Sequence, residues 1–271
     1  NELRKVETTD ENGNKVITFT DALGRAVLKR VQLDDMQEGT MVDYLETYTI
    51  YDDFGRVKYT LSPKAVAAFA ANSWTFSQSV IDEFGYEYKY DSLGRVIEKK
   101  VPGSAWVYYG YDDLDRLVLM QDGILRGTNQ WMFIKYDKKH RAVMQGLYTD
   151  AVNVTRSAIQ SVLDGLYTST NATYPENAWY ESRGTALENY TNNSFPKTNQ
   201  NASALSILSV NYYDDHDFDN SGTDDYSYVS QGLAGEGIPA SAYGRPTGSK
   251  RKILNTSTWL YTYVFYDKYG R

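Results

Sequence analysis

The chain has 271 residues with 28 Lys and Arg against 35 Asp and Glu, a formal net charge of −7. This acidic balance argues against nucleic acid or an anionic membrane surface as a partner, and no apolar run approaches the ~20 residues that a membrane-spanning helix needs. The chain has no cysteine, which excludes disulfides, thiolate catalysis and zinc–cysteine sites. Its hydrophobic content of 41% is typical of a globular protein.

The first 61 residues are predicted to form β-strands. Residues 15–20 lie between turns that begin at Asp10 and Asp21, and this spacing leaves room for one strand of about seven residues. Asp91 and Asp112 begin two later turns and are separated by about two strand lengths, so the chain returns to the same edge. The spacing predicts an up-and-down antiparallel sheet.

A short helix is predicted near residues 63–72, because Ser62 suits the N-cap, proline suits the first helical position and the alanines favour helix. Strands then resume at Trp74 and continue to about Gly146, with a turn at residues 121–123. Residues 106–111 and 131–136 are apolar at nearly every position, which predicts strands covered on both faces.

The pattern changes after residue 150. Apolar residues at helical spacing predict a helix over 154–164, and the Asn-, Ser- and Thr-rich residues 167–204 predict a polar insertion of long loops. Residues 204–213 read as a strand, and the glycine-rich residues 232–248 as a loop. The last clear strand is predicted over 259–266.

One short motif recurs along the chain. In YDSLGR at residues 90–95, Asp91 can bond backbone N–H groups of the turn, and Gly94 can adopt a positive φ. Asp-x-x-Gly therefore predicts a hairpin turn. Asp115 and His140 replace the glycine in two copies, and both residue types tolerate the left-handed region. The copies are TDENG (9–13), TDALGR (20–25), YDDFGR (51–56), IDEFG (81–85), YDSLGR (90–95), YDDLDR (111–116), YDKKHR (136–141) and YDKYGR (266–271).

This repeated Tyr-Asp-x-x-Gly-Arg resembles the YD repeat of Rhs-family proteins. The resemblance covers residues 1–145 densely and residues 205–271 sparsely. It implies a β-rich shell, because YD hairpins of this family wind into a hollow cocoon that often encloses a toxic C-terminal segment. It also implies a bacterial protein that is secreted or displayed on the cell surface. The chain stops at Arg271 within a hairpin motif, which predicts a fragment of a longer protein.

The predicted fold is mainly β, with antiparallel YD-repeat hairpins in a curved, cocoon-like sheet, two short helices and a polar insertion. Three regions are expected: YD-repeat hairpins over residues 1–150, a helix with the polar insertion over 151–204, and further YD-like strands over 205–271, where the last hairpin is truncated.

An acidic run provides the one metal-site hypothesis. Asp215, Asp217 and Asp219 alternate as the first three ligands of a calcium loop would. However, Gly222 falls at position 8 rather than 6 of such a loop, and no glutamate occupies position 12. The competing interpretation is a solvated acidic loop after a degenerate Tyr-Asp turn. Calcium at Asp215, Asp217 and Asp219 is the only cofactor hypothesis, and no other cofactor is expected.

No catalytic set is recognisable in the sequence, which has two histidines and no nucleophile-elbow, Walker or dinucleotide motif. The first hypothesis is therefore a non-catalytic structural segment of an Rhs/YD-repeat shell, partnered by the rest of that shell and its C-terminal segment. The alternative is an adhesin-like module that binds glycans or a surface protein through aromatic residues such as Tyr108, Trp131 or Trp179. The competing interpretation of these three residues is that they belong to the sheet core.

Overall fold

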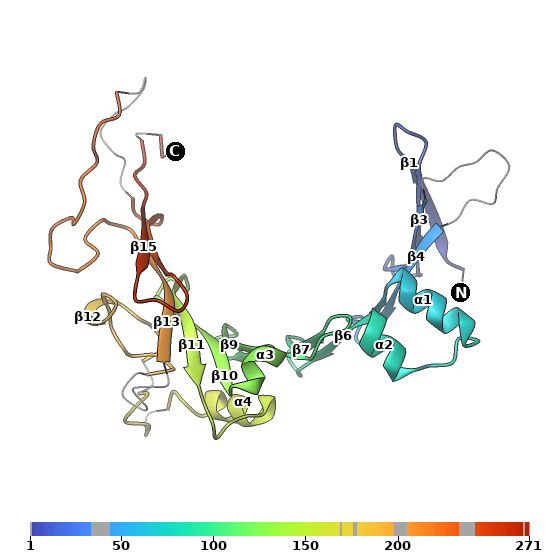
Figure 1. Cartoon of the computed structure of the whole chain (residues 1–271), viewed down its shortest axis with the longest axis horizontal. Helices are drawn as coiled ribbons and strands as arrows, with labels where there is room; N and C mark the ends of the chain where they lie inside the picture. Colours follow the sequence, from blue (N-terminus) through green and yellow to red (C-terminus); the bar gives the residue numbers. More distant parts are fainter. Residues whose placement is uncertain are drawn as a thin grey trace. The chain divides into compact units, whose positions relative to one another are not determined.

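The structure, a computed structural model, describes residues 2–33, 44–168, 170–175, 178–197, 205–232, 242–267 and 269–270. Fourteen strands form one antiparallel sheet in which they follow one another in chain order (Figure 1). The sheet is not closed, because its first and last described strands do not pair with each other. The prediction of a mainly β fold built from antiparallel hairpins is confirmed. These strands are β1 (Arg4–Thr9), β2 (Lys15–Thr20), β3 (Ala26–Gln32), β4 (Tyr44–Tyr51), β5 (Val57–Leu61), β6 (Gly85–Tyr90), β7 (Val96–Lys100), β8 (Val107–Tyr111), β9 (Leu117–Gln121), β10 (Gln130–Tyr136), β11 (Ala142–Thr149), β13 (Leu205–Tyr213), β14 (Pro246–Lys252) and β15 (Trp259–Tyr263).

A further short strand, β12 (Arg183–Leu187), does not belong to this sheet. By its internal contacts the chain divides into two compact units, residues 1–108 and residues 109–271. The three regions expected from the sequence, which differ from these two compact units, remain a prediction.

The described residues form four helices, two of them at the predicted positions. Ser62 and Thr155 act as the N-caps of the two predicted helices, each hydroxyl accepting a hydrogen bond from the backbone N–H three residues later. The helices are α1 (Pro63–Ala71), α2 (Gln78–Phe84), α3 (Gly123–Gly127) and α4 (Arg156–Asp164). The predicted count of two helices was therefore too low.

Helix α2 corrects the predicted turn at residues 81–85. Ile81 is buried in an apolar cluster between the helices and the sheet, and the Asp82 carboxylate bonds Gln78 and Lys100 instead of closing a turn. This copy has Tyr86 where the regular copies have arginine, and Gly85 has a φ of −103°. Helix α3 replaces the turn predicted at residues 121–123, because the Asp122 carboxylate caps it through the Leu125 N–H at 2.8 Å.

Each unit has its own core. In the first unit, α1 and α2 pack on the sheet around Leu61, Ala65, Val66, Phe69 and Ile81. In the second unit, buried core residues include Leu119 of β9, Trp131 and Phe133 of β10, and Leu163 of α4.

The repeated turns share one hydrogen-bond pattern. In the turn at residues 91–95, Asp91 Oδ1 accepts the N–H groups of Leu93 and Arg95 at 3.0 and 2.9 Å, and Asp91 Oδ2 accepts the Arg95 Nε–H at 2.7 Å. Gly94 has a φ of +83°. The turns that begin at Asp21, Asp52, Asp112 and Asp137 repeat these three bonds. Asp115 and His140 have φ values of 59° and 60°, so they replace the glycine in the left-handed region as predicted.

A second pattern connects successive repeats at five places. The Tyr90 ring lies against the Arg56 guanidinium of the preceding turn at 4.6 Å, and its hydroxyl donates to the carbonyl of Val57 at 2.7 Å. The same contact recurs with 4.3–5.0 Å between the arginine guanidinium and the centre of the tyrosine ring. In each case the tyrosine hydroxyl donates a hydrogen bond of 2.7–3.1 Å to the backbone carbonyl of the residue after the arginine. The pairs are Arg25–Tyr51, Arg56–Tyr90, Arg116–Tyr136, Arg141–Tyr213 and Arg245–Tyr266.

The turn geometry predicts different outcomes for two substitutions of Gly94. No heavy atom outside the adjacent residues lies within 4 Å of a Cβ built on Gly94, so a side chain there meets only the backbone cost of its φ of +83°. We expect Gly94→Val to lower the unfolding free energy by about 1–2 kcal/mol or more. Gly94→Asn should lose less, because asparagine tolerates this region. Urea unfolding of both variants measures the difference, and equal losses would contradict the turn assignment.

Candidate functional site

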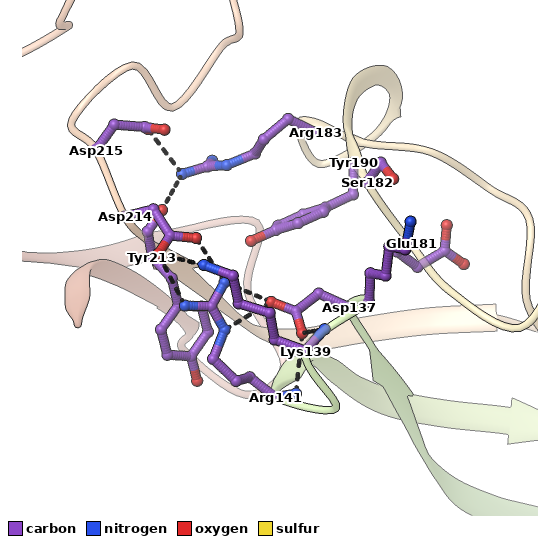
Figure 2. A pocket seen from close by; sticks show the side chains of 11 residues that line it. Asp137, Lys139, Arg141, Glu181, Ser182, Arg183, Tyr190, Tyr213, Asp214 and Asp215 are labelled. Atoms are coloured by element: carbon purple, nitrogen blue, oxygen red, sulfur yellow. Dashed lines mark hydrogen bonds and ion pairs between the residues drawn. The ribbon is translucent and has the colours of Figure 1, made fainter. Parts of the chain in front are cut away.

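A cavity of about 230 Å³ lies in the second unit, at the turn between β10 and β11 (Figure 2). Its walls come from three segments: the turn at residues 137–141, residues 181–183 with Tyr190, and residues 213–215. We call this cavity the charged pocket. Its geometry depends on how the chain around Asp214 is folded.

Asp214 belongs to a repeat that is split in two. The Asp214 N–H donates to the Arg245 carbonyl at 3.0 Å, the bond that closes each regular turn, and Gly244 has a φ of +83°. Tyr213 contacts the arginine of the preceding repeat, and Arg245 contacts the tyrosine of the next. Residues 213–214 and 244–245 are therefore two halves of one YD repeat, separated by an insertion at residues 215–243.

This split repeat corrects two predictions. The acidic run does not follow a degenerate Tyr-Asp turn, because Tyr213 and Asp214 belong to the split repeat. The loop predicted over residues 232–248 is wrong at its end, because β14 begins at Pro246. Residues 233–241 of this predicted loop lie outside the described residues. The available signal was the Gly-Arg dipeptide at residues 244–245, which also ends the regular copies at 24–25 and 55–56.

Arg141 is the central cation of the charged pocket. Its guanidinium bonds Asp137 Oδ2 within its own turn and both carboxylate oxygens of Asp214, at 2.6 Å for Nη2–Oδ2 and 3.1 Å for Nη1–Oδ1. Lys139 Nζ and the Gly244 N–H also donate to Asp214 Oδ1. The Arg141 guanidinium, aided by these two donors, holds the pKa of Asp214 well below its ordinary value.

Arg183 lies on another wall of the charged pocket, among aromatic rings. Its guanidinium is 4.6 Å from the Tyr212 ring centre and 5.3 Å from that of Tyr190, and it lies 3.4 Å from the carboxylate of Asp215. Partial burial raises the pKa of Asp215 from its ordinary value. Asp215, a predicted calcium ligand, is thus an ion-pair partner of Arg183 in this structure.

The other two predicted calcium ligands come together with a third carboxylate. Oxygens of Asp217, Asp219 and Asp225 all lie within 4.8 Å of one another. Asp217 accepts the N–H groups of Ser221 and Gly222, each at 2.8 Å, so its carboxylate also holds the loop. The structure gathers a different acidic set from the predicted one, and calcium binding remains a prediction.

A buried ion pair lies beside the charged pocket. The side chains of Lys135 and Glu181 are both 0% exposed, and Lys135 Nζ lies 2.8 Å from Glu181 Oε1. Glu181 also accepts hydrogen bonds from Thr191 Oγ1, the Asn193 N–H, and the N–H and hydroxyl of Ser194. Burial alone would raise the pKa of Glu181, but Lys135 and these donors hold it below its ordinary value.

The aromatic residues proposed as a binding platform are largely engaged in packing. Trp131 is 0% exposed and belongs to the core. Trp179 stacks on Tyr167 with ring centres 3.9 Å apart, and Tyr108 is half-buried. Trp131 cannot contact a ligand at the surface without unfolding of the core around it.

Comparisons with known proteins gave structural matches only. No family model matches the chain, and no curated protein sequence matches it. Similar solved structures include the crystal structure of TcdB2-TccC3 (12% identity, 99% of this chain, 14% of that chain, TM-score 0.42) and the Photorhabdus luminescens Tc holotoxin pore (14% identity, 97% of this chain, 13% of that chain, TM-score 0.40). The chain thus spans about 14% of the length of the structures it matches. Among the described residues, no helix is long and apolar enough to cross a membrane.

The buried pair predicts a large loss of stability on Glu181→Gln. The substitution leaves the Lys135 ammonium buried without its counter-charge, which typically costs about 3–5 kcal/mol. Asp215→Asn is the control in the same unit, since the Asp215 side chain is 50% exposed in its own ion pair and we expect at most about 1 kcal/mol there. Urea unfolding followed by tryptophan fluorescence compares the two variants. Similar losses would contradict the role given to the buried pair.

The depressed pKa of Asp214 predicts a pH-dependent contribution to stability. A carboxyl whose pKa is lower in the folded than in the unfolded chain stabilises the fold above its ordinary value of 3.8, and loses this effect as the pH falls towards the folded value. Asp214→Asn should therefore lower the unfolding free energy by about 1.5–3 kcal/mol at pH 7 and by less below pH ~4. The exposed Asp224→Asn is the charge-matched control. A pH-independent difference for Asp214→Asn would contradict this account.

Proposed function

We propose that this chain is a non-catalytic structural segment of an Rhs/YD-repeat shell in a large secreted or surface-exposed bacterial protein. The observation that carries the proposal is the arginine–tyrosine contact between successive repeats. Each recurring residue of the Tyr-Asp-x-x-Gly-Arg motif has a structural role, since the aspartate and glycine form the turn, the arginine bonds the aspartate, and the tyrosine contacts the preceding arginine. Such residues build a wall by addition of hairpins.

The pairing of charges in the charged pocket supports a structural role over a catalytic one. Arg141 binds Asp137 and Asp214, and Arg183 approaches Asp215, so the cations and carboxylates neutralise one another. A catalytic acid or base needs a proton-transfer partner in a substrate, and its pKa is usually tuned towards the working pH. The lowered pKa of Asp214 is shifted away from neutral pH, and Asp215, whose pKa is raised by partial burial, is paired with Arg183.

The enclosure of a C-terminal toxin is part of the proposal and follows from the motif resemblance. In this arrangement, the partners of the segment are the other hairpins of the same polypeptide and the segment that they enclose. In the described part of the chain, β1 and β15 are the terminal strands of the sheet, and their outer edges are compatible with further strands, because an unpaired edge presents free N–H and C=O groups.

Electron microscopy of the natural full-length protein tests the proposal. We expect a hollow particle whose wall contains residues 1–271 as a run of hairpins, and a C-terminal segment that a protease cannot cut until the particle is unfolded. A protein in which this chain forms a separate lobe, with a C-terminal segment that is cut at once, would overturn the proposal.

A further inference from the structure

A second cavity in the second unit, of about 140 Å³, lies on one face of β13, β14 and β15. We call it the aromatic pocket. Five aromatic side chains contribute to its walls: Tyr212, Phe218, Tyr226, Tyr261 and Tyr263. Its polar lining consists of Asn189, Asp219, Asp225, Ser249 and Lys250.

The insertion within the split repeat forms one wall of the aromatic pocket. Phe218 lies over the sheet at Gly248, where a Cβ built on the glycine would be 2.6 Å from the ring. The ring is 4.7 Å from that of Tyr212 and 5.8 Å from that of Tyr263. The Asp225 carboxylate accepts the Phe218 N–H at 2.6 Å and so fixes the loop that carries the ring. The wall is therefore held by packing and by hydrogen bonds.

The opposite wall consists of tyrosine rings that remain accessible. Tyr261 is 56% exposed and Tyr226 is 42% exposed, while the rings of Tyr226 and Tyr263 are 3.8 Å apart. Tyr261 and Tyr263 point to the same side of β15 and are stacked at 6.3 Å with an angle of 16° between their planes. Tyr263 itself is half-buried. The exposed ring of Tyr261 therefore offers the apolar platform, with its hydroxyl at the rim.

The polar groups around this platform include both donors and acceptors. Lys250 offers only donors, and its Nζ is paired with Glu188. Asp219 and Asp225 offer only acceptors, and a carboxylate has about four lone-pair sites, more than the loop N–H groups use. Asn189 offers both. This mixed set suits hydroxyl groups, each of which both donates and accepts a hydrogen bond.

We propose that the aromatic pocket binds one sugar ring of an uncharged glycan. The apolar face of a pyranose would stack on Tyr261, and its hydroxyls would bond the side chains of Asn189, Asp225 and Lys250. An organic cation also suits aromatic rings and carboxylates, but it would meet the ammonium of Lys250 in the same pocket. An anion would meet Asp219 and Asp225. A neutral polyhydroxyl ligand avoids both repulsions.

The size of the pocket limits how much of a glycan it takes. A site that encloses a drug-sized ligand usually has a volume of about 300–1,000 Å³, whereas the aromatic pocket has about 140 Å³. It is therefore large enough for one ring with the remaining sugars in solvent, and the expected contact is with a terminal residue. This binding goes beyond the structural role proposed above and does not depend on it.

Saturation-transfer NMR of the 271-residue chain with neutral methyl pyranosides tests the proposal. The probes are the methyl glycosides of glucose, galactose, mannose, fucose and N-acetylglucosamine. We expect transfer to at least one of them, a tenfold or greater loss of affinity in Tyr261→Ala, and nearly full affinity in Tyr261→Phe, which keeps the ring. Leu260→Ala is the matched control, because Leu260 is 60% exposed on the other side of the same strand.

Three results would overturn the proposal. The first is no transfer to any of the glycosides in a chain whose unfolding transition is intact. The second is an equal loss of affinity in Tyr261→Ala and Leu260→Ala. The third is binding of tetramethylammonium, lost in Tyr261→Ala, without binding of any glycoside, because the pocket would then be a cation site.

Discussion

The arginine of each repeat makes the interaction on which the rest of the sheet depends. The guanidinium is planar, and its edge and its face are used differently. Its edge bonds the aspartate of the same turn, as in the 2.7 Å bond from Arg56 Nε to Asp52 Oδ2, while its face carries the tyrosine of the next repeat. One side chain therefore fixes a turn and positions the following hairpin. Lysine has a single point charge and cannot present both an edge and a face, which accounts for arginine at this position in the regular copies.

The arginine–tyrosine contacts join successive repeats, so the chain can leave the sheet within a repeat and return to complete it. The split repeat shows how far this tolerance extends. The bond from the Asp214 N–H to the Arg245 carbonyl is made although 31 sequence positions separate the two residues, and the stacking partners on both sides are kept. The entropy cost of closing a loop rises only slowly with its length. The repeat therefore constrains its two halves and leaves the intervening residues free to vary.

The sequence predicted the local geometry of the fold much better than its long-range contacts. Asp-x-x-Gly-Arg has a turn chemistry of its own, so the hairpins and even the replacements at Asp115 and His140 could be predicted. The turn predicted at residues 81–85 is wrong, because burial of Ile81 in a helix outweighed the preference of a turn motif that lacks arginine. Lys135 lies in a strand that reads as apolar, and its partner Glu181 is 46 residues away. No local pattern connects the two. The Gly-Arg dipeptide at residues 244–245 marks one half of the split repeat, but it does not identify Asp214 as the other half.

The chain departs from its own repeat in two insertions, the first between β11 and β13 and the second at residues 215–243. Glu181 and Lys135 attach the first insertion to β10, and the Asp225 carboxylate orders the start of the second. The aromatic pocket combines Asn189 from the first insertion with Phe218 and Tyr226 from the second. Repeat residues are already committed to turns and stacking, so a change there disturbs the sheet. Insertion residues other than anchors such as Glu181 and Asp225 can change without that cost, because these few points hold the backbone. Recognition is therefore best placed where the insertions lie against the sheet, as at Tyr261 of β15, with the repeats as the rigid support.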